Sequence, residues 1–229
     1  MTHRKARNSS VMKAAARISM VATAGIAMAA TSTTASATSG NLYMSRNMSA
    51  AVDMARTHAD RVHVDQFDES FQVHEFGPLV AVTANNRATA ESAGCSPLDP
   101  CRSVALSYQI VTTAGRNARL INATNISRAV NYHCDSCQTF SGAYQFVVAT
   151  PQKLTLSSDT RGRLDDIHRE VAALRASHLS ISEVQRRADA LAQQVKTILD
   201  REVASAPRTA GGDPLADFNP TVTLHRHVA

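Results

Sequence analysis

Four cysteines are the residues of this chain whose type and spacing could most readily do chemistry. Five residues separate Cys95 from Cys101, and two separate Cys134 from Cys137. Thiol pairs at such spacings form disulfides, bind zinc or exchange electrons with a substrate, and the compartment decides among these fates. In an exported chain we expect disulfides at Cys95, Cys101, Cys134 and Cys137, with no resident metal or cofactor.

Four cysteines allow three disulfide pairings. A loop of about 40 residues would constrain the unfolded chain by about 4 kcal/mol, against about 2 kcal/mol for the loop from Cys134 to Cys137. An internal repeat, described below, favours the local pairs Cys95–Cys101 and Cys134–Cys137, because equivalent positions in a duplicated unit should do equivalent work. Each disulfide would then pin one turn and the register of its strands.

Zinc binding is the alternative use of these thiols. The Cys-x5-Cys spacing of the first pair lies outside the usual Cys-x2–4-Cys, although His133 beside Cys134 could add a ligand. Thiol–disulfide oxidoreductase activity is a weaker alternative. Thioredoxin-like chemistry places its first cysteine at a helix N-terminus, whereas the residues after Cys137 have the pattern of a strand.

No enzymatic activity is predicted, and no residue is assigned a catalytic role. A zinc protease of the His-Glu-x-x-His type needs both histidines on one helix face. The only His-Glu pair is His74-Glu75, and Pro78 stands where the second histidine would be. The chain also lacks a Gly-x-Ser-x-Gly nucleophile elbow.

Residues 1–37 have the pattern of a secretory signal peptide. Five basic residues are followed by an apolar run over 18–30 and by Ala35-Ser36-Ala37, a small-x-small cleavage signal. The apolar run is shorter than the roughly 20 residues that span a bilayer. We therefore expect cleavage after Ala37, secretion, and no stable membrane anchor afterwards.

The expected mature chain is close to neutral, so it is not a strongly basic protein. The 24 Lys and Arg residues include the five of the signal, which leaves 19 against 19 Asp and Glu residues. No block of basic residues occurs after Thr38, so nucleic-acid binding is not expected. The predicted partner is an unknown extracellular or cell-envelope protein.

An internal repeat organises the middle of the chain, in copies over about 79–114 and 117–150. The stretches CRSVALSYQIV and CQTFSGAYQFV share a cysteine and, seven residues later, Tyr-Gln before an apolar pair. Asn86 and Asn125 each lie nine residues before the first cysteine of their copy. We expect three short strands per copy, about six in all, forming a duplicated antiparallel β unit.

The other segments complete an α+β fold. Helical spacing of apolar residues predicts a short amphipathic helix at 47–60, within a polar segment over 38–60. Alternation from Val62 to Phe76 predicts a strand, so that the β domain covers 61–150. Apolar spacing of 3-4-3 predicts a C-terminal helical hairpin over 159–206, with one long kinked helix as the alternative. Residues 207–229, rich in Pro and Gly at their start, are predicted to be a flexible tail.

The block NATNISRAVNYHC…CQTFSGAYQFVV, with its weaker upstream copy, resembles an uncharacterised family of small exported bacterial proteins. The family is marked by a tandem unit in which a cysteine pair precedes an Ala-rich strand ending in Gln and apolar residues, and the resemblance covers roughly 79–205. Some members are labelled peptide zinc metalloproteases. The longer Cys95–Cys101 spacing departs from the family's tighter Cys-x-x-Cys. The resemblance implies export and this architecture, and the chain is expected to be a non-enzymatic structural or interaction module.

Overall fold

The computed structural model describes residues 48–206 and 218–229. The predicted signal peptide and the start of the predicted tail lie outside these residues. In chain order, the described elements are β1 (Met48–Ala59), β2 (Asp65–Pro78), β3 (Ala81–Ala93), β4 (Arg102–Ala114), β5 (Ile121–Tyr132), β6 (Gln138–Thr150), α2 (Ser158–Ala173), the 3-10 turn η1 (Leu174–Ala176), α3 (Ile181–Ser205) and β7 (Thr221–Val228). The fold is therefore α+β: six strands, two helices and a final strand.

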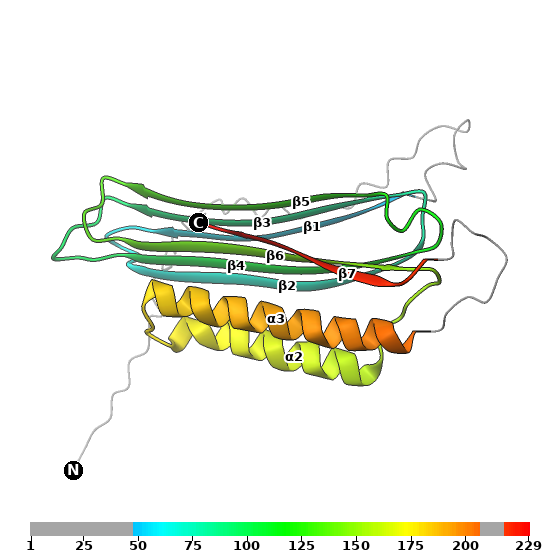
Figure 1. Cartoon of the computed structure of the whole chain (residues 1–229). Coiled ribbons are helices and arrows are strands. Elements are labelled where there is room, and N and C mark those ends of the chain that lie inside the picture. The colour runs from blue at the N-terminus through cyan, green and yellow to red at the C-terminus, as the bar shows by residue number, and fades with distance from the viewer. Residues whose placement is uncertain (1–47, 207–217) are drawn as a thin grey trace, which may run out of the picture. The chain divides into compact units, whose positions relative to one another are not determined.

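The strands form two sheets that are stacked face to face (Figure 1). One sheet has the order β1-β3-β5 and the other β2-β4-β6-β7. Every pairing among the first six strands is parallel, and only β7 runs antiparallel, along β6. The antiparallel unit predicted from the sequence is thus wrong. The two strands that flank each cysteine turn lie in different sheets, so the chain crosses between sheets at that turn instead of forming a hairpin.

The first six strands therefore form three successive pairs, which we call rungs: β1 with β2, β3 with β4, and β5 with β6. Each rung contributes one strand to each of the two sheets. The register sets Phe71 opposite Tyr108 and Tyr108 opposite Tyr144, and the following glutamines align in the same way. In the other sheet, Asp53, Asn86 and Asn125 are successive Cα partners. The pattern noted in two copies is therefore also present in the first rung, as Ser-Phe-Gln-Val over 70–73.

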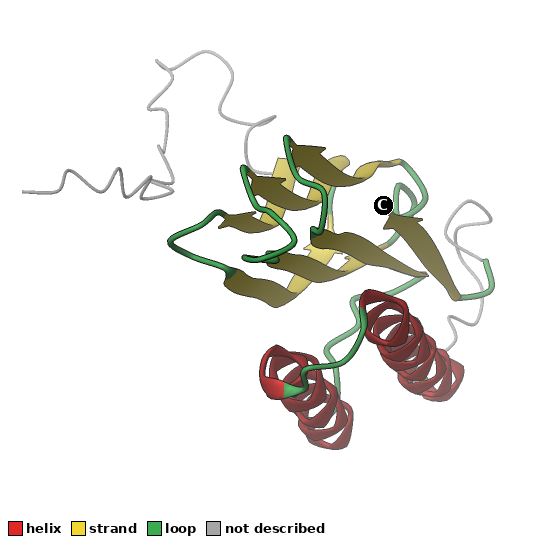
Figure 2. Ribbon diagram, turned by 90° about the vertical axis from the view of Figure 1, so that its left-hand side faces the viewer, coloured by secondary structure: helices red, strands yellow, loops and turns green. Residues whose placement is uncertain are grey.

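Both helices lie on the β2-β4-β6-β7 sheet, on the side away from the other sheet (Figure 2). The rings of Tyr108 and Tyr144 stack with centroids 4.7 Å apart beneath α3. Their hydroxyl groups donate to the Ala188 carbonyl and to Asp189 Oδ1, each at 2.8 Å, which satisfies both buried groups. Because this sheet is covered on both faces, nearly every residue of β4 and β6 is buried.

The helical hairpin consists of two separate helices. The side chains of Ser157 and Ser180 accept hydrogen bonds from the backbone N–H groups of Thr160 and Glu183, and so cap the N-termini of α2 and α3. The turn between the helices includes His178, whose φ of +46° breaks the helical path. The second helix ends at Ser205, just before Pro207, because proline lacks the N–H that would continue it.

The space between the sheets is filled by small and polar side chains, including a cluster of five alanines: Ala55, Ala88, Ala90, Ala105 and Ala143. This filling explains why residues 47–60 form the strand β1 and not the predicted helix. Along β1, Asp53 and the alanines at 51, 55 and 59 face inward, while Val52 and Met54 are 66% and 56% exposed. The apolar spacing that indicated a helix mixed residues from both faces of a strand.

Side chains occupy the open edges of the β1-β3-β5 sheet. At the first rung, Asp68 Oδ2 accepts a hydrogen bond from the Arg56 backbone N–H at 2.8 Å. At the last rung, Nδ1 of His227 accepts from the Ser127 backbone N–H at 3.0 Å. His227 belongs to β7, which lies in the predicted tail, so the prediction of a flexible tail is wrong for residues 221–228. These contacts block edge positions that could otherwise pair with another strand.

Candidate functional site: an exposed sheet face and a cysteine cluster

The β1-β3-β5 sheet leaves its outer face uncovered in the described part of the chain (Figure 2). Side chains alternate along β1 and β3, so their inward residues are buried and the neighbouring residues point to solvent. We call this surface the outer face; its central residues are Val52, Met54, Arg56 and His58 of β1, Asn85, Arg87, Thr89 and Glu91 of β3, and Thr124, Ile126 and Arg128 of β5.

Three arginines from three strands meet on the outer face. Arg56, Thr89 and Arg128 form one cross-strand row, and Arg87 lies in the next row, between Met54 and Ile126. Neighbouring strands are about 4.8 Å apart, so the backbones of Arg56 and Arg128 are separated by about 10 Å. These residues surround a shallow hollow of about 360 Å³ that Glu91 also lines.

The charges on this face are only partly neutralised. Arg56 lies 3.8 Å from a carboxylate oxygen of Glu91, which also lies 3.6 Å from His58 Nδ1. Arg128 donates to the hydroxyl group of Tyr132 at 3.3 Å. Within residues 48–206 and 218–229, Arg87 has no hydrogen bond or ion pair. Three guanidinium groups thus face one carboxylate, and Arg87 remains available to a ligand.

Beneath the outer face, a buried polar ladder joins the two sheets. Gln109 Nε2 donates to Asp53 Oδ2 at 2.7 Å, and Gln145 Nε2 donates to Gln109 Oε1 at 2.8 Å. The Asn86 amide donates to Asn125 Oδ1 at 2.9 Å. The ladder holds the strands in register and so fixes the positions of the arginines above it.

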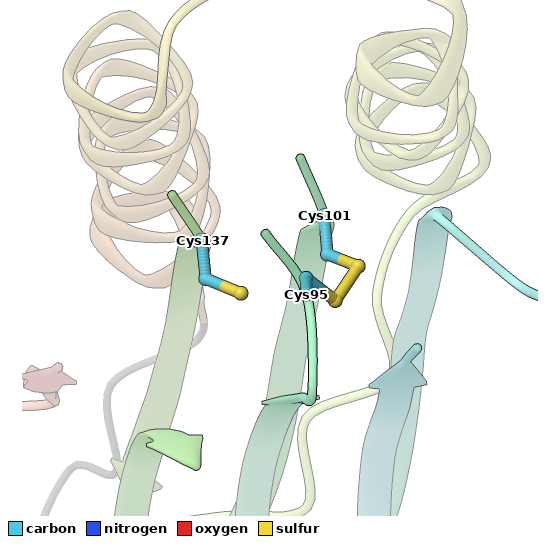
Figure 3. A group of neighbouring side chains, drawn as sticks. All are labelled: Cys95, Cys101 and Cys137. Carbon is cyan, nitrogen blue, oxygen red and sulfur yellow. A yellow bond between two sulfur atoms is a disulfide. The ribbon is translucent and has the colours of Figure 1, made fainter. Parts of the chain in front are cut away.

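The cysteines gather where the chain crosses between sheets in the second and third rungs (Figure 3). Cys95 pairs with Cys101, with Cα atoms 5.9 Å apart, and Cys134 pairs with Cys137 at 5.7 Å. These are the local pairs predicted from the repeat. Gly94 and His133, which precede the first cysteine of each pair, both have positive φ values, of +68° and +49°. We call the four cysteines the cysteine cluster.

Sulfur atoms of different pairs lie close together in the cysteine cluster. The Sγ atoms of Cys95, Cys101 and Cys137 are all within 4.8 Å of one another. Such spacing could suit a zinc ion if the thiols were reduced, because each Zn–S bond is about 2.3 Å long. Cys95 and Cys101 are buried, whereas Cys134 and Cys137 are partly exposed.

The histidines that suggested metal or protease chemistry make other contacts. His74 Nε2 lies 2.8 Å from Asp53 Oδ2, between the sheets. Its neighbour Glu75 accepts a hydrogen bond from the Leu156 backbone N–H at 2.7 Å and pairs with Arg161, on the helix side. The two side chains therefore point to opposite faces of β2. His168 of α2 lies 3.0 Å from Glu69 and stacks on Phe71.

Comparisons with known proteins identify no relative: no protein-family model, curated protein or solved structure matches the chain. The resemblance to a family of exported proteins therefore stays a prediction. Among the described residues, no helix has both the length and the apolar character needed to cross a membrane.

Sequence reasoning missed the outer-face arginines. It looked for basic residues that are close along the chain, whereas Arg56, Arg87 and Arg128 are brought together only by the register of three parallel strands. The signal that could have located them is the Phe-Gln of the first rung, which matches the Tyr-Gln of both repeats. Recognising it would have indicated a third rung; the structure then sets the register of the rungs, which aligns Asp53 with Asn86 and Asn125 and places Met54, Arg87 and Ile126 in one outward row.

Proposed function

We propose that this protein is an exported, non-enzymatic interaction module, pinned by two disulfides, that binds an acidic protein through its outer face. One observation carries the proposal: the β1-β3-β5 sheet presents Arg56, Arg87 and Arg128 around a shallow hollow, and nothing in the described residues covers them. In the other sheet, the central strands β4 and β6 are buried on both faces. The fold thus holds one sheet rigid and leaves the opposite surface free for a partner.

The chemistry of the outer face favours a protein over a simple anion. Met54 and Ile126 flank Arg87 in one row, and Val52 is exposed in the row before it. Arginine and methionine are enriched in protein interfaces, where an apolar centre and charge-assisted hydrogen bonds act together. A segment carrying Asp or Glu between apolar residues would place its carboxylates on the guanidinium groups and its apolar side chains on Met54 and Ile126.

The test uses a fluorescent peptide of alternating Glu and Leu, with binding followed by anisotropy. The double variant R87E/R128E should weaken binding by at least about tenfold, because two favourable charge contacts become repulsive. R169E/R201E, on the exposed surfaces of α2 and α3, makes the same change in net charge away from the outer face. Equal losses in the two variants would refute the outer face as the binding site. Equally tight binding of single-stranded DNA, lost in R87E/R128E, would replace the protein partner with a nucleic acid.

Export is the other part of the proposal, and it rests on the signal-like residues 1–37 together with the two disulfides. Its test is the intact mass of the protein recovered from the medium of its producer, without reductant and after alkylation. A chain starting at Thr38, four hydrogens lighter than its reduced form and not alkylated, is the expected result. A retained N-terminus or alkylated thiols would contradict it.

Zinc binding is a second candidate function, favoured by the three Sγ atoms that lie within 4.8 Å of one another. If it holds, the reduced protein binds Co²⁺ with the near-ultraviolet absorption of thiolate ligands, and Zn²⁺ displaces the cobalt. Replacing Cys137 should abolish this absorption, whereas Cys134 lies outside the group of three and its replacement should weaken it less. Absence of the absorption in the reduced wild type would end this candidacy.

A further inference from the structure

The two disulfides of the cysteine cluster are placed to exchange with each other. The Gln138 backbone N–H donates to the Cys101 carbonyl at 2.8 Å. That bond sets Cys137 and Cys101 side by side, at the starts of the neighbouring strands β6 and β4. Parallel strands keep equivalent side chains on the same side, so the two sulfur atoms face each other. Figure 3 shows the Cys137 side chain pointing toward the Cys95–Cys101 disulfide.

Exposure makes the two disulfides unequal toward a reductant. Cys95 is 3% exposed and Cys101 1% exposed, whereas Cys134 and Cys137 are partly exposed to solvent. Thiol–disulfide exchange requires a thiolate to reach a sulfur atom. An external thiol therefore meets the Cys134–Cys137 disulfide first, and the buried disulfide has only one other thiol source close by, which is Cys137.

We propose that the cysteine cluster is a two-disulfide relay, in which Cys137 passes reducing equivalents from an external dithiol to the buried Cys95–Cys101 disulfide. A thiolate of the dithiol attacks Cys134 Sγ, which forms a mixed disulfide and releases Cys137 as a thiolate. Cys137 then attacks Cys101 Sγ, forming a Cys137–Cys101 disulfide and releasing the Cys95 thiolate. The second thiol of the dithiol resolves the mixed disulfide and frees Cys134. The dithiol is oxidised by two electrons, and the internal exchange conserves the number of disulfides.

This chemistry differs from thioredoxin-like catalysis. Cys137 leads into the strand β6, whereas the first cysteine of a thioredoxin-like site opens a helix. What the cluster supplies is proximity: the attacking and attacked sulfur atoms belong to one rigid unit, which raises their effective concentration. Exchange should speed up with rising pH, since a free cysteine has a pKa of about 8.5 and only its thiolate attacks.

The test compares C134S with C137S, each left with one cysteine of the second pair. In C134S, the unpaired Cys137 stands beside the buried disulfide, whereas in C137S the unpaired Cys134 lies outside the group of three close sulfur atoms. Each protein is held without oxidant at alkaline pH, its free thiol is blocked with N-ethylmaleimide, and it is digested with trypsin without reductant. Cys95 and Cys101 fall in the peptide 88–102, and position 137 falls in 129–153.

We expect C134S to yield the two peptides joined by a disulfide, with the maleimide partly on Cys95, at a level at least about tenfold above C137S. The chain must be monomeric on a non-reducing gel, so that the link is internal. If the maleimide in C134S is confined to Cys137 and the peptide 88–102 keeps its own disulfide, the relay is refuted. Equal cross-linking in the two variants also refutes the relay, because the location of the unpaired cysteine, at position 137 or 134, would then make no difference.

A second measurement covers the case in which C134S fails to fold. Dithiothreitol is added to the wild type and to the double variant C134S/C137S, and reduction of Cys95–Cys101 is followed by alkylation and mass spectrometry. Loss of the relay should slow reduction of the buried disulfide by about tenfold in the double variant. Equal rates would show that the reductant reaches the buried disulfide directly. Neither measurement depends on the outer face, so failure here leaves the proposed binding function intact.

Discussion

Gln109 Nε2 donates to Asp53 Oδ2 at 2.7 Å, which joins a strand of one sheet to a strand of the other through a buried carboxylate. His74 Nε2 lies 2.8 Å from the same oxygen, and Asp53 is 8% exposed. In the second and third rungs, the register partners of Asp53 are Asn86 and Asn125. The first rung therefore places an ionisable residue where the later rungs use a neutral amide.

The substitution D53A should destabilise the protein by about 3 kcal/mol, because it removes the acceptor shared by His74 and the buried Gln109 amide, and leaves that amide only its bond to the Asn85 carbonyl. D53N should cost about 1 kcal/mol or less, since its amide oxygen can still accept from Gln109. Urea denaturation followed by circular dichroism measures both values. If D53N lost as much stability as D53A, the negative charge rather than the hydrogen bond would be the feature that matters.

Several elements were predictable because their signals are local. The 3.6-residue period of Leu164, Ile167 and Val171, and the serine at each helix start, define α2 and α3 without tertiary information. The two cysteine pairs followed from the matched spacing of two short stretches. In both cases the interacting residues are close in sequence: the paired cysteines are 6 and 3 residues apart, and the apolar residues of a helix recur within a few positions.

Strand direction and the identity of the inward residues could not be predicted in the same way. Both strands of a hairpin and both strands of a rung show the same alternation, so nothing local shows that the chain crosses to a second sheet at Cys95–Cys101. In β1 the usual rule is also reversed, because Ala55 is buried and Met54 exposed. Only the narrow interior, lined by alanines of four strands, makes small residues the correct inward choice.

Gly142 makes room for the aromatic stack under α3. A Cβ atom built at this position would lie 2.9 Å from the Tyr144 ring and 3.2 Å from a methyl group of Leu106. G142A should therefore destabilise the protein by about 1–3 kcal/mol through overpacking. The control G162A adds a methyl group to the middle of α2, where nothing lies within 4 Å, and should stabilise by about 0.5–1 kcal/mol.

Thermal and urea denaturation of G142A and G162A distinguish packing from backbone effects. Both variants replace glycine by alanine in regular structure, so any general benefit of a less flexible unfolded chain is shared. A stabilising effect of G142A would mean that the Tyr144 ring moves aside at little cost, and that the stack with Tyr108 is not tightly fixed.

The final strand β7 protects the edge of β6. It pairs with β6 from Gly142 to Ala149, and its residues Val222, Leu224 and Val228 pack against the main core. Removing residues 218–229 would expose the edge of β6, and the unpaired N–H and C=O groups of such an edge are a site for pairing with other chains. We expect the truncated protein to form larger species than the full chain in size-exclusion chromatography with light scattering.

The control for the truncation is R226A, which removes the two hydrogen bonds from Arg226 to Asp189 but keeps the backbone of β7. It should elute with the full chain. A truncated protein of unchanged size would show that β6 is protected by something other than β7.

Asp189 of α3 gives the protein an acid-dependent part of its stability. Burial opposes ionisation of this carboxyl group, but hydrogen bonds from Arg226 and Tyr144 outweigh it and hold the pKa of Asp189 below its ordinary value of 3.8. The unfolded chain therefore binds a proton more readily than the folded one between these two pKa values. The stabilisation is present above pH 3.8 and is lost as the pH falls through the lower, folded pKa.

D189N removes this carboxylate while keeping an oxygen that can accept from Tyr144. Its urea midpoint should lie below that of the wild type at pH 7, and the two midpoints should converge as the pH falls through the lowered pKa of Asp189, where the wild-type carboxyl group also becomes neutral. E202Q should behave in the same direction, because hydrogen bonds from Thr160 and Ser157 outweigh burial and lower the pKa of Glu202. If the difference in urea midpoint between D189N and the wild type stayed constant from pH 7 to pH 2, the Asp189 carboxylate would not be its source. A difference that does not depend on pH cannot come from a titrating group.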